Sequence, residues 1–339
     1  MPRPVHQWLP EQWLGRGWAA QSLRPLSWLY GVLLQLRKWA YRQSWLTTQR
    51  VNATVIVVGN VVAGGAGKTP TTIALVQHLQ KHGWKVGVVS RGHGRLTSDV
   101  RPVLAHSTPD EVGDEPLLIA QATGVPVWVG ASRAQAAQSL LQAAPGTPII
   151  VCDDGLQHLA LARDIEVCVM DDRGVGNGWL LPAGPLREPW PRPVDLLLHT
   201  GPAAVAGGFQ AQRQLAPWAV RANGERLALS SLQGQPVDAV AGLARPEAFF
   251  DMLRGAGLQL TKTQALPDHA DFANWPATAL ERPLLCTEKD AAKLWPHQPD
   301  ALAVPLLLNV ESGFWAALDA MLAERMGTPL SLAHGQKIA

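Results

Sequence analysis

Short apolar runs alternate with helical stretches along this chain from residue 51 onward. The runs predict buried strands at Thr54–Val58, Lys85–Ser90, Pro126–Val129, Pro148–Cys152, Ile165–Met170 and Val194–His199. Helical spacing is found at Thr71–His82, which Gly83 closes, and at Ser132–Ala144. Strands and helices in this order are typical of βαβ units around a buried parallel sheet.

A second, shorter α/β pattern follows residues 201–235, a stretch rich in Gly, Ala, Gln and Pro with little periodicity. Its predicted strands are Ala239–Gly242, Leu284–Cys286 and Val304–Leu308, and its predicted helices are Pro246–Gly255, Lys289–Trp295 and Gly313–Arg325. A chain of 339 residues, 47% of them apolar, is long enough for two domains with their own cores. We therefore expect an α/β core at 51–200, a connector or hinge at 201–235, and a smaller α/β domain at 236–339.

The first fifty residues carry a different, more evenly apolar helical pattern. One face is lined by Leu29, Leu33, Leu36 and Ala40, and the opposite strip holds Gly31, Gln35, Lys38 and Arg42. The longest uncharged run here, Pro25–Leu36, has twelve residues, whereas a bilayer core needs about 20. The pattern predicts an N-terminal amphipathic helix, and two interpretations stay open: packing on the protein's own core, or lying on a membrane surface.

Charge and tryptophan content favour the membrane interpretation of segment 1–50. The chain has a formal net charge of +2, but this segment holds seven basic residues against one acid, which makes it +6 and the remainder −4. Six of the fourteen tryptophans also lie here, and Trp combined with Arg and Lys favours an anionic membrane surface. Glu11, Arg16 and Arg24 interrupt any secretory signal core. We expect no nucleic-acid partner, because the basic residues are not interspersed with RNA-stacking sequence.

Cysteine usage indicates a reducing compartment. Cys152, Cys168 and Cys286 each lie in an apolar run, and they form no CxxC pair. Buried reduced thiols are therefore expected in place of a metal site or a disulfide.

The most chemically informative stretch is VVAGGAGKTP at 61–70, between a predicted strand and a predicted helix. A glycine-rich turn in that context aims backbone N–H groups at one phosphate, and the helix dipole adds a favourable field. Lys68 would neutralise the β- and γ-phosphates, and the Thr69 hydroxyl would ligate Mg²⁺. We expect ATP to be cradled by Val62, Ala63, Gly64, Gly65, Ala66, Gly67, Lys68 and Thr69. Residues 51–200 are thus predicted to form a P-loop NTPase-like domain with a parallel sheet.

The loop departs from the strict G-x-x-x-x-G-K-[ST] pattern, because Val62 stands at the first glycine position. It resembles the GGxGKT loops of nucleotide switches, but these usually carry a lysine where this chain has Ala63. A membrane-targeted P-loop ATPase or GTPase switch is the alternative function, although no [NT]KxD guanine signature occurs. A glycine turn that holds no nucleotide is the remaining structural alternative.

Two acids follow the predicted strand at 148–152 and indicate a metal site. Asp153 and Asp154 come directly after PIIVC, as in a Walker B strand, where an acid completes the magnesium coordination. We expect at least one of them, Asp153 in preference, to bind the metal. Ordinary turn formation before Gly155 is the structural alternative.

Eight ordered motifs together resemble those of the tetraacyldisaccharide 4'-kinase family. They are VVAGGAGKTP (61–70), SRGHGR (90–95), VGDEP (112–116), DDGLQH (153–158), LLPAGPLREP (180–189), GLARPEAFF (242–250), PDHADF (267–272) and TEKDAAKL (287–294). The resemblance spans residues 10–325 and implies transfer of the γ-phosphate of ATP, with Mg²⁺, to the 4'-hydroxyl of the tetraacyldisaccharide 1-phosphate precursor of lipid A. It also implies two α/β domains around a cleft and a peripheral position at the cytoplasmic face of the bacterial inner membrane.

The resemblance assigns roles motif by motif. It places Asp114 at the position of the catalytic base, Glu115 beside it as a metal-side acid, and His269 as the histidine that pairs with Asp114. An imidazole in that position orients the carboxylate and shares the proton taken from the sugar hydroxyl. The candidate substrate or phosphate contacts are Arg91, His158, Arg187 and Glu188. No protein partner is predicted.

Structural alternatives stay open at several of these positions. GDEP is compatible with an exposed turn before a helix that starts at Pro116, and Thr287 with Asp290 is compatible with a helix cap. Three residues depart from the family pattern, where a tyrosine, a phenylalanine and a second histidine are common: His93, Leu156 and Ala270. These departures concern packing around the substrate and leave the residues assigned to chemistry in place.

Overall fold

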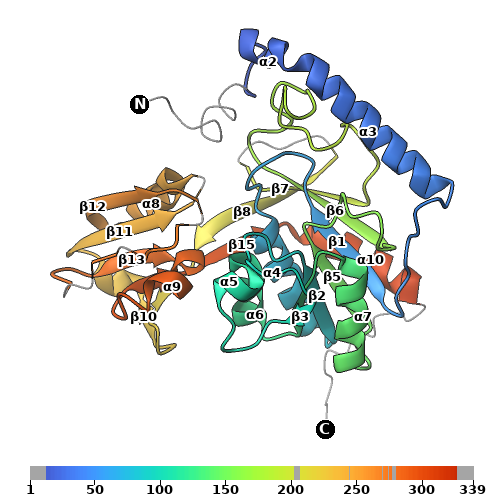
Figure 1. The fold of residues 1–339 in the computed structure, drawn as a ribbon. Helices are drawn as coiled ribbons and strands as arrows, with labels where there is room; N and C mark the ends of the chain where they lie inside the picture. The colour runs from blue at the N-terminus through green and yellow to red at the C-terminus, as the bar shows by residue number, and fades with distance from the viewer. Residues whose placement is uncertain are drawn as a thin grey trace.

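The computed structural model describes residues 13–201, 207–243, 245–268, 270–273, 275–276 and 280–326. Two sheets organise this part of the chain, a larger one beside the N-terminal helices and a smaller one at the other end of the molecule (Figure 1). Strands β8 (Phe209–Leu215) and β15 (Leu306–Val310) pair with each other on the side of the larger sheet that leads to the smaller one.

The larger sheet has the strand order β15-β8-β7-β6-β1-β5-β2-β4-β3. Its other strands are β1 (Thr54–Gly59), β2 (Val86–Ser90), β3 (Arg101–Pro102), β4 (Val127–Val129), β5 (Ile149–Asp153), β6 (Ile165–Met170) and β7 (Leu196–His199). Neighbours pair in parallel except at the edges, where β3 and β15 are antiparallel. Val58 lies level with Asp153, so the strand before the glycine loop and the strand with the acid pair end together.

Helices cover both faces of the larger sheet. On one face lie α4 (Lys68–Lys81), α6 (Asp114–Thr123) and α10 (Ser312–Met326), and on the other lies α7 (Arg133–Ala143). A short helix, α5 (Pro109–Val112), precedes α6. Val58 and Val57 of the central strand point into opposite cores, as the two-residue period of a strand requires.

The smaller sheet has the order β10-β9-β14-β13-β11-β12 and carries one helix on each face. Its elements are β9 (Trp218–Val220), β10 (Arg226–Ala228), the 3₁₀ turn η1 (Leu229–Leu232), β11 (Pro236–Gly242), α8 (Pro246–Gly255), β12 (Gln259–Leu266), β13 (Leu284–Thr287), α9 (Glu288–Leu294) and β14 (Leu302–Val304). Phe249 and Phe250 of α8 anchor one core, and Leu294 of α9 anchors the other.

The structure corrects the predicted boundaries 201–235 and 236–339. The predicted connector contributes β8 to the larger sheet and β9 and β10 to the smaller one. The predicted strand Val304–Leu308 is two strands in different sheets, because Pro305 lies between them. After it, β15 and α10 return to the larger sheet, where Phe314, Leu318 and Leu322 are fully buried. The larger domain is therefore built from both halves of the chain.

The cysteines behave as the sequence predicts. Cys152, Cys168 and Cys286 are free and buried. Burial raises the pKa of the Cys152 thiol to about 11, so it stays protonated near neutral pH.

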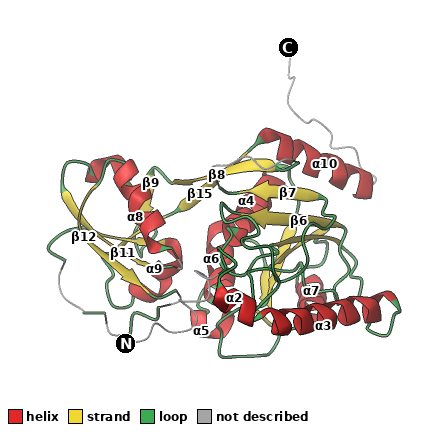
Figure 2. Cartoon of the chain, turned by 90° about the horizontal axis from the view of Figure 1, so that it is seen from above, coloured by secondary structure: helices red, strands yellow, loops and turns green. Residues whose placement is uncertain are grey.

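Two N-terminal helices, α2 (Trp18–Ser22) and α3 (Arg24–Arg42), lie along one side of the larger domain (Figure 2). One side of α3 contacts that domain, where Ser27 is buried and Lys38 pairs with Glu188 at 2.9 Å. The other side carries large apolar side chains that are between 44% and 64% exposed: Leu26, Trp28, Leu29, Val32, Leu33, Leu36 and Trp39. The predicted apolar face is therefore turned away from the protein core. Within the described residues, no helix combines the length and the apolar content that crossing a bilayer requires.

Candidate active site

The glycine loop follows β1 and leads directly into α4, in the strand–loop–helix context that the sequence predicts. Gly67 caps α4 with a left-handed backbone, at a φ of 91°, and Gly64 has a φ of 94°. Glycine adopts this conformation without a steric penalty. Lys68 and Thr69 form the first turn of α4, and each is only 8% exposed. The loop and the helix N-terminus together have the form of a phosphate site.

Three residues that the sequence did not single out hold this loop in place. The Arg173 guanidinium donates to two carbonyl oxygens of the loop at 3.4 and 3.1 Å, and the Thr200 hydroxyl donates to a third at 3.0 Å. Arg213 donates to Thr200 at 2.9 Å, and a Cβ built on Gly67 would lie 2.7 Å from its guanidinium. These residues lie over 100 positions beyond the loop and in no shared motif, so no local signal identifies them.

Asp153, the last residue of β5, is the buried acid of this site. Thr72 donates to one carboxylate oxygen at 3.0 Å, and Ser90 donates to the other at 3.3 Å. Burial, together with the negative charges of Glu115 and Asp154, raises the pKa of Asp153 to about 7. A cation beside this carboxylate would favour its ionised form, so the environment suits a metal ion.

Asp154 connects the phosphate loop to a distant motif. Its carboxylate accepts two hydrogen bonds from Arg187 at 2.9 and 3.1 Å, and it lies 3.8 Å from the Lys68 ammonium. Its backbone has a φ of 47°, a conformation that is costly outside glycine and occurs often at functional sites. Three of the predicted site residues, Lys68, Asp154 and Arg187, therefore converge on one point.

Asp114 begins α6, so the alternative of an exposed turn before a helix starting at Pro116 is wrong. The residue is 7% exposed, and its carboxylate pairs with Lys293 of α9 at 2.8 Å. Gly113, before it, has a φ of 90°, and a Cβ there would lie 2.9 Å from the carbonyl oxygen of His93. GDEP therefore packs closely against the SRGHGR loop, and the ion pair with Lys293 connects it to the smaller domain.

The TEKD motif is a helix cap with an additional contact. The Thr287 hydroxyl accepts from the backbone N–H of Asp290 at 3.2 Å, as a cap does. The Asp290 carboxylate accepts from the N–H of Gly242 in β11 at 2.9 Å, which fixes α9 to the sheet. His269 lies outside the described residues. Its neighbour Asp268 pairs with Lys289 of the same helix at 2.8 Å.

The remaining predicted contacts differ in how accessible they are. Arg91 is exposed, and His158 is half-buried with its Nε2 accepting from the backbone N–H of Arg133 at 3.3 Å. Burial, reinforced by nearby arginines, lowers the pKa of His158 to about 4, so this imidazole is neutral at physiological pH. Glu188 is 3% exposed and binds Lys38 at 2.9 Å and Gln157 at 2.8 Å. The Glu188 carboxylate therefore joins α3 to the loop that carries Arg187.

An apolar groove of about 730 Å³ lies between α3 and the loop 178–189. Trp28 and Leu36 line it from α3, and Trp179 and Leu180 line it from the loop. Arg187 belongs to the same loop, and its carbonyl oxygen accepts from the Tyr30 hydroxyl of α3 at 2.8 Å. The loop 178–189 therefore contributes both to the apolar groove and to the ionic site.

These features define a class of protein: a P-loop nucleotide-binding protein with a second α/β domain that contacts the larger domain through Asp114 and Lys293. The sequence profile of the family described as tetraacyldisaccharide-1-P 4'-kinase matches residues 19–326. The chain belongs to this family.

Individual relatives agree with that assignment. The tetraacyldisaccharide 4'-kinase of Acidovorax sp. (strain JS42) is 58% identical over 325 residues, which cover 95% of this chain and 96% of the relative. The enzyme of the same name from Polaromonas naphthalenivorans (strain CJ2) is 54% identical over 343 residues, covering 98% and 99%. The crystal structure of Aquifex aeolicus LpxK in complex with ATP is similar with a TM-score of 0.79 and 26% identity, over 90% of this chain and 99% of that one.

Proposed function

We propose that this protein transfers the γ-phosphate of ATP to the 4'-hydroxyl of a tetraacyldisaccharide 1-phosphate, the precursor of lipid A. The observation that carries the proposal is the joint placement of the ionic site at Lys68, Asp154 and Arg187 with the apolar groove under α3. An acceptor with a charged sugar head and several acyl chains needs both. Its family and its relatives are named for this acceptor, and the switch alternative has no support among them.

The nucleotide is assigned to residues 62–69. Backbone N–H groups of this loop and the positive end of α4 bind the β- and γ-phosphates, and Lys68 neutralises charge that develops during transfer. The contacts from Arg173 and Thr200 hold the loop in one conformation before the nucleotide arrives. The similar Aquifex structure is recorded with ATP, which supports this assignment.

Mg²⁺ fits the donor set around Lys68. Magnesium takes one or two protein carboxylates and completes its shell with phosphate oxygens and water. Thr69 and Asp153 are the proposed first ligands, and burial together with the negative charges of Glu115 and Asp154 raises the pKa of Asp153. When bound, the ion offsets negative charge on the transferred phosphate.

Asp114 is the proposed base. Its carboxylate accepts the proton of the 4'-hydroxyl as the oxygen attacks the γ-phosphorus and the bond to the β–γ bridging oxygen breaks, so that ADP leaves, and His269 orients the carboxylate and shares that proton. The Asp114 carboxylate pairs with the Lys293 ammonium at 2.8 Å. Because Lys293 belongs to α9, the position of the smaller domain controls the state of the base.

The acceptor's head group is assigned to Arg187, which pairs with Asp154, and to Arg91 and His158. Glu188 acts on the acceptor through the loop that it holds to α3. The acyl chains extend into the groove and the adjoining bilayer. The exposed apolar side of α3 and the +6 charge of segment 1–50 suit peripheral binding to the anionic cytoplasmic face of the inner membrane.

The test follows labelled γ-phosphate from ATP into an organic-phase lipid product. Wild-type protein with Mg²⁺ should transfer the label, and Arg187→Ala should reduce transfer because Asp154 loses the guanidinium that it binds and the acceptor loses its proposed cation. Arg254→Ala, which removes an exposed arginine of α8, is the matched control and should leave transfer unchanged. ATP hydrolysis without label in the lipid fraction would overturn the proposal.

A further inference from the structure

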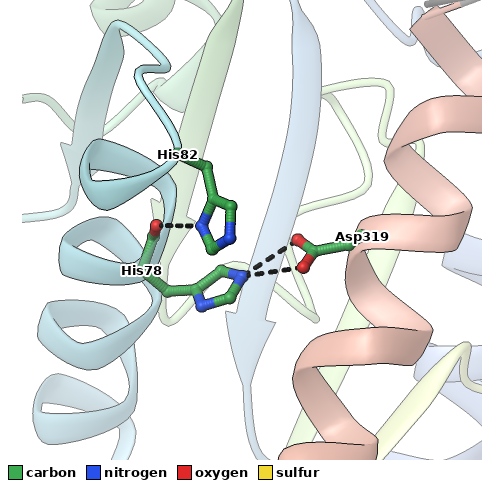
Figure 3. Close-up of side chains that lie close together, drawn as sticks. All are labelled: His78, His82 and Asp319. Carbon is green, nitrogen blue, oxygen red and sulfur yellow. Dashed lines mark hydrogen bonds and ion pairs between the residues drawn. The ribbon is translucent and has the colours of Figure 1, made fainter. Parts of the chain in front are cut away.

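Three side chains of metal-binding type meet at a place that the proposed kinase chemistry does not use. His78 and His82 lie one turn apart at the end of α4, and Asp319 faces them from α10 (Figure 3). One ligand atom from each residue lies within 4.8 Å of the other two. His78 is ten residues from Lys68 along α4, which corresponds to about 15 Å of helix.

The His82 ring is oriented for binding a cation. Its Nδ1 lies 2.8 Å from the carbonyl oxygen of His78, and because a carbonyl only accepts, Nδ1 carries the proton. In the neutral ring this leaves the lone pair on Nε2, which Figure 3 shows turned toward the side of Asp319. A backbone carbonyl that fixes the tautomer in this way is the usual support of a metal-binding histidine.

His78 and Asp319 already have nearly the spacing of two ligands to one ion. The His78 Nε2 lies 2.9 and 3.1 Å from the two Asp319 oxygens. Two donors at about 2.0 Å from a tetrahedral zinc ion lie about 3.3 Å apart, so an ion can replace the shared proton with little movement. Trp315 stacks on the His78 ring at 4.3 Å and an interplanar angle of 10°, which holds that ring in place.

The donor set selects the type of ion. Two imidazole nitrogens and one carboxylate suit a borderline cation such as Zn²⁺, whereas Mg²⁺ prefers oxygen donors alone. The carbonyl end of α4 adds a favourable negative field, and Lys81 opposes it with one positive charge. His82 is exposed, so water can complete the coordination from the solvent side.

We propose that His78, His82 and Asp319 form a Zn²⁺ site that links α10 to the helix of the phosphate loop. The site joins two elements that are 241 residues apart in sequence at Asp319 and His78. A bound ion would therefore stabilise the return of the chain to the larger sheet. The proposal does not rest on the kinase activity, and either can fail without the other.

The test compares wild-type full-length protein with His82→Asn. The substitution removes one ligand and the exposed hydrogen bond from His82 to the His78 carbonyl, but leaves the hydrogen bond between His78 and Asp319, so each protein is compared with its own metal-free melting temperature. After chelator treatment, zinc is titrated with equilibrium dialysis, metal analysis and thermal unfolding. We expect wild type to bind one more zinc ion per chain than His82→Asn, with a melting temperature that rises by several degrees. Zinc binding at this site should weaken at least about tenfold in the variant, so the stoichiometries are compared at free zinc concentrations that only just fill the wild-type site.

The controls separate this site from other zinc-binding groups. His106→Asn removes an exposed histidine from a loop elsewhere and should behave as wild type. The acids near Lys68 are present in every variant, so the difference between proteins isolates the histidine cluster. Equal zinc stoichiometry and equal thermal shifts in wild type and His82→Asn would overturn the proposal, as would the lack of any zinc-dependent shift in wild type. A Mg²⁺ titration should not distinguish the two proteins.

Discussion

The surroundings of the phosphate loop and the outer side of α3 break the ordinary rule of burial in opposite directions. Around the loop, Lys68, Asp114 and Asp153 are charged or acidic groups that are at most 8% exposed. On α3, Leu29 and Leu33 are each 56% exposed. Buried acids are tolerated where neighbouring groups or a ligand stabilise them. Exposed leucines are tolerated where an apolar partner, such as the interior of a membrane, can cover them. Departures from the burial rule thus mark the two places that the proposed function assigns to ATP and to the lipid acceptor.

The largest effect is expected from Asp114→Asn, which keeps the shape of the side chain and removes the base. Phosphate transfer to the lipid should fall by about 10²- to 10⁴-fold. Label transfer at saturating ATP measures the rate. Denaturant unfolding checks that the variant stays folded although Lys293 now faces an uncharged amide. A folded variant with wild-type turnover would remove Asp114 from the mechanism.

The double variant with His269→Ala sharpens this result. If the two residues act as one unit, the double variant loses far less than the product of the two single losses. Losses that multiply strictly would show that Asp114 and His269 act independently.

Lys68→Ala tests the other buried charge. Loss of a cation that acts on the transition state should lower kcat by about 10²- to 10³-fold. Asp154 keeps its pairing with Arg187 in this variant, so the fold should persist. Lys85→Ala, an exposed lysine just after α4, is the matched control. Full activity in Lys68→Ala would contradict the assignment of the loop to nucleotide.

Leu33→Asp on α3 and Leu318→Ala on α10 test the comparison between exposed and buried leucines directly. Leu318→Ala, in the buried core, should lower the free energy of unfolding by about 2–5 kcal/mol. Leu33→Asp should leave the free energy of unfolding almost unchanged. Its affinity for anionic vesicles, measured by co-sedimentation, should fall by about tenfold or more, because a leucine buried in lipid contributes about 1.5–3 kcal/mol. Comparable destabilisation by both variants would mean that the outer side of α3 is part of a core.

The smallest effect concerns pH. Asp153 has a folded-state pKa of about 7 against an ordinary value of 3.8, so the folded protein holds this proton more tightly than the unfolded chain. The resulting stabilisation is complete below pH 3.8 and is lost as the pH rises through about 7. In metal-free protein the contribution of Asp153 to stability should therefore fall as the pH rises from about 4 to about 7, and His158 opposes it because its pKa is lowered in the folded state from 6.5 to about 4. Asp153→Asn should flatten this slope in thermal unfolding, and an unchanged slope would assign it to other groups.

Local patterns predict the parallel strands well, because a buried strand needs only a short apolar run and a βαβ unit repeats it. The phosphate loop is predictable for the same reason, since strand, glycines and helix are adjacent in sequence. Which sheet a strand joins is a different matter. Val304 and Leu306 have similar side chains, yet they belong to different sheets because Pro305 and the partners β8 and β13 decide it.

The site shows the same division between local and distant information. The order of the motifs identifies Asp114 and Lys68 as candidate site residues. It does not predict that Asp114 pairs with Lys293, 179 residues away. Nothing in the spacing of TEKDAAKL distinguishes this lysine from Lys289, which pairs with Asp268 instead. Helical periodicity also does not predict that the apolar face of α3 points outward, because it identifies an apolar face but not the surface that this face contacts.

The return of the chain to the larger sheet also sets the order in which the protein can be completed during synthesis. Residues 312–326 leave the ribosome after the whole smaller domain, although Phe314, Leu318 and Leu322 fill the larger domain's core. At about 5–20 residues per second, the interval between the end of β8 and the end of α10 is roughly 5–20 s. During that interval one face of the nascent larger sheet lacks the packing of α10, while the smaller domain can already fold. The ribosome-bound chain is therefore most exposed to aggregation and to chaperones just before α10 emerges.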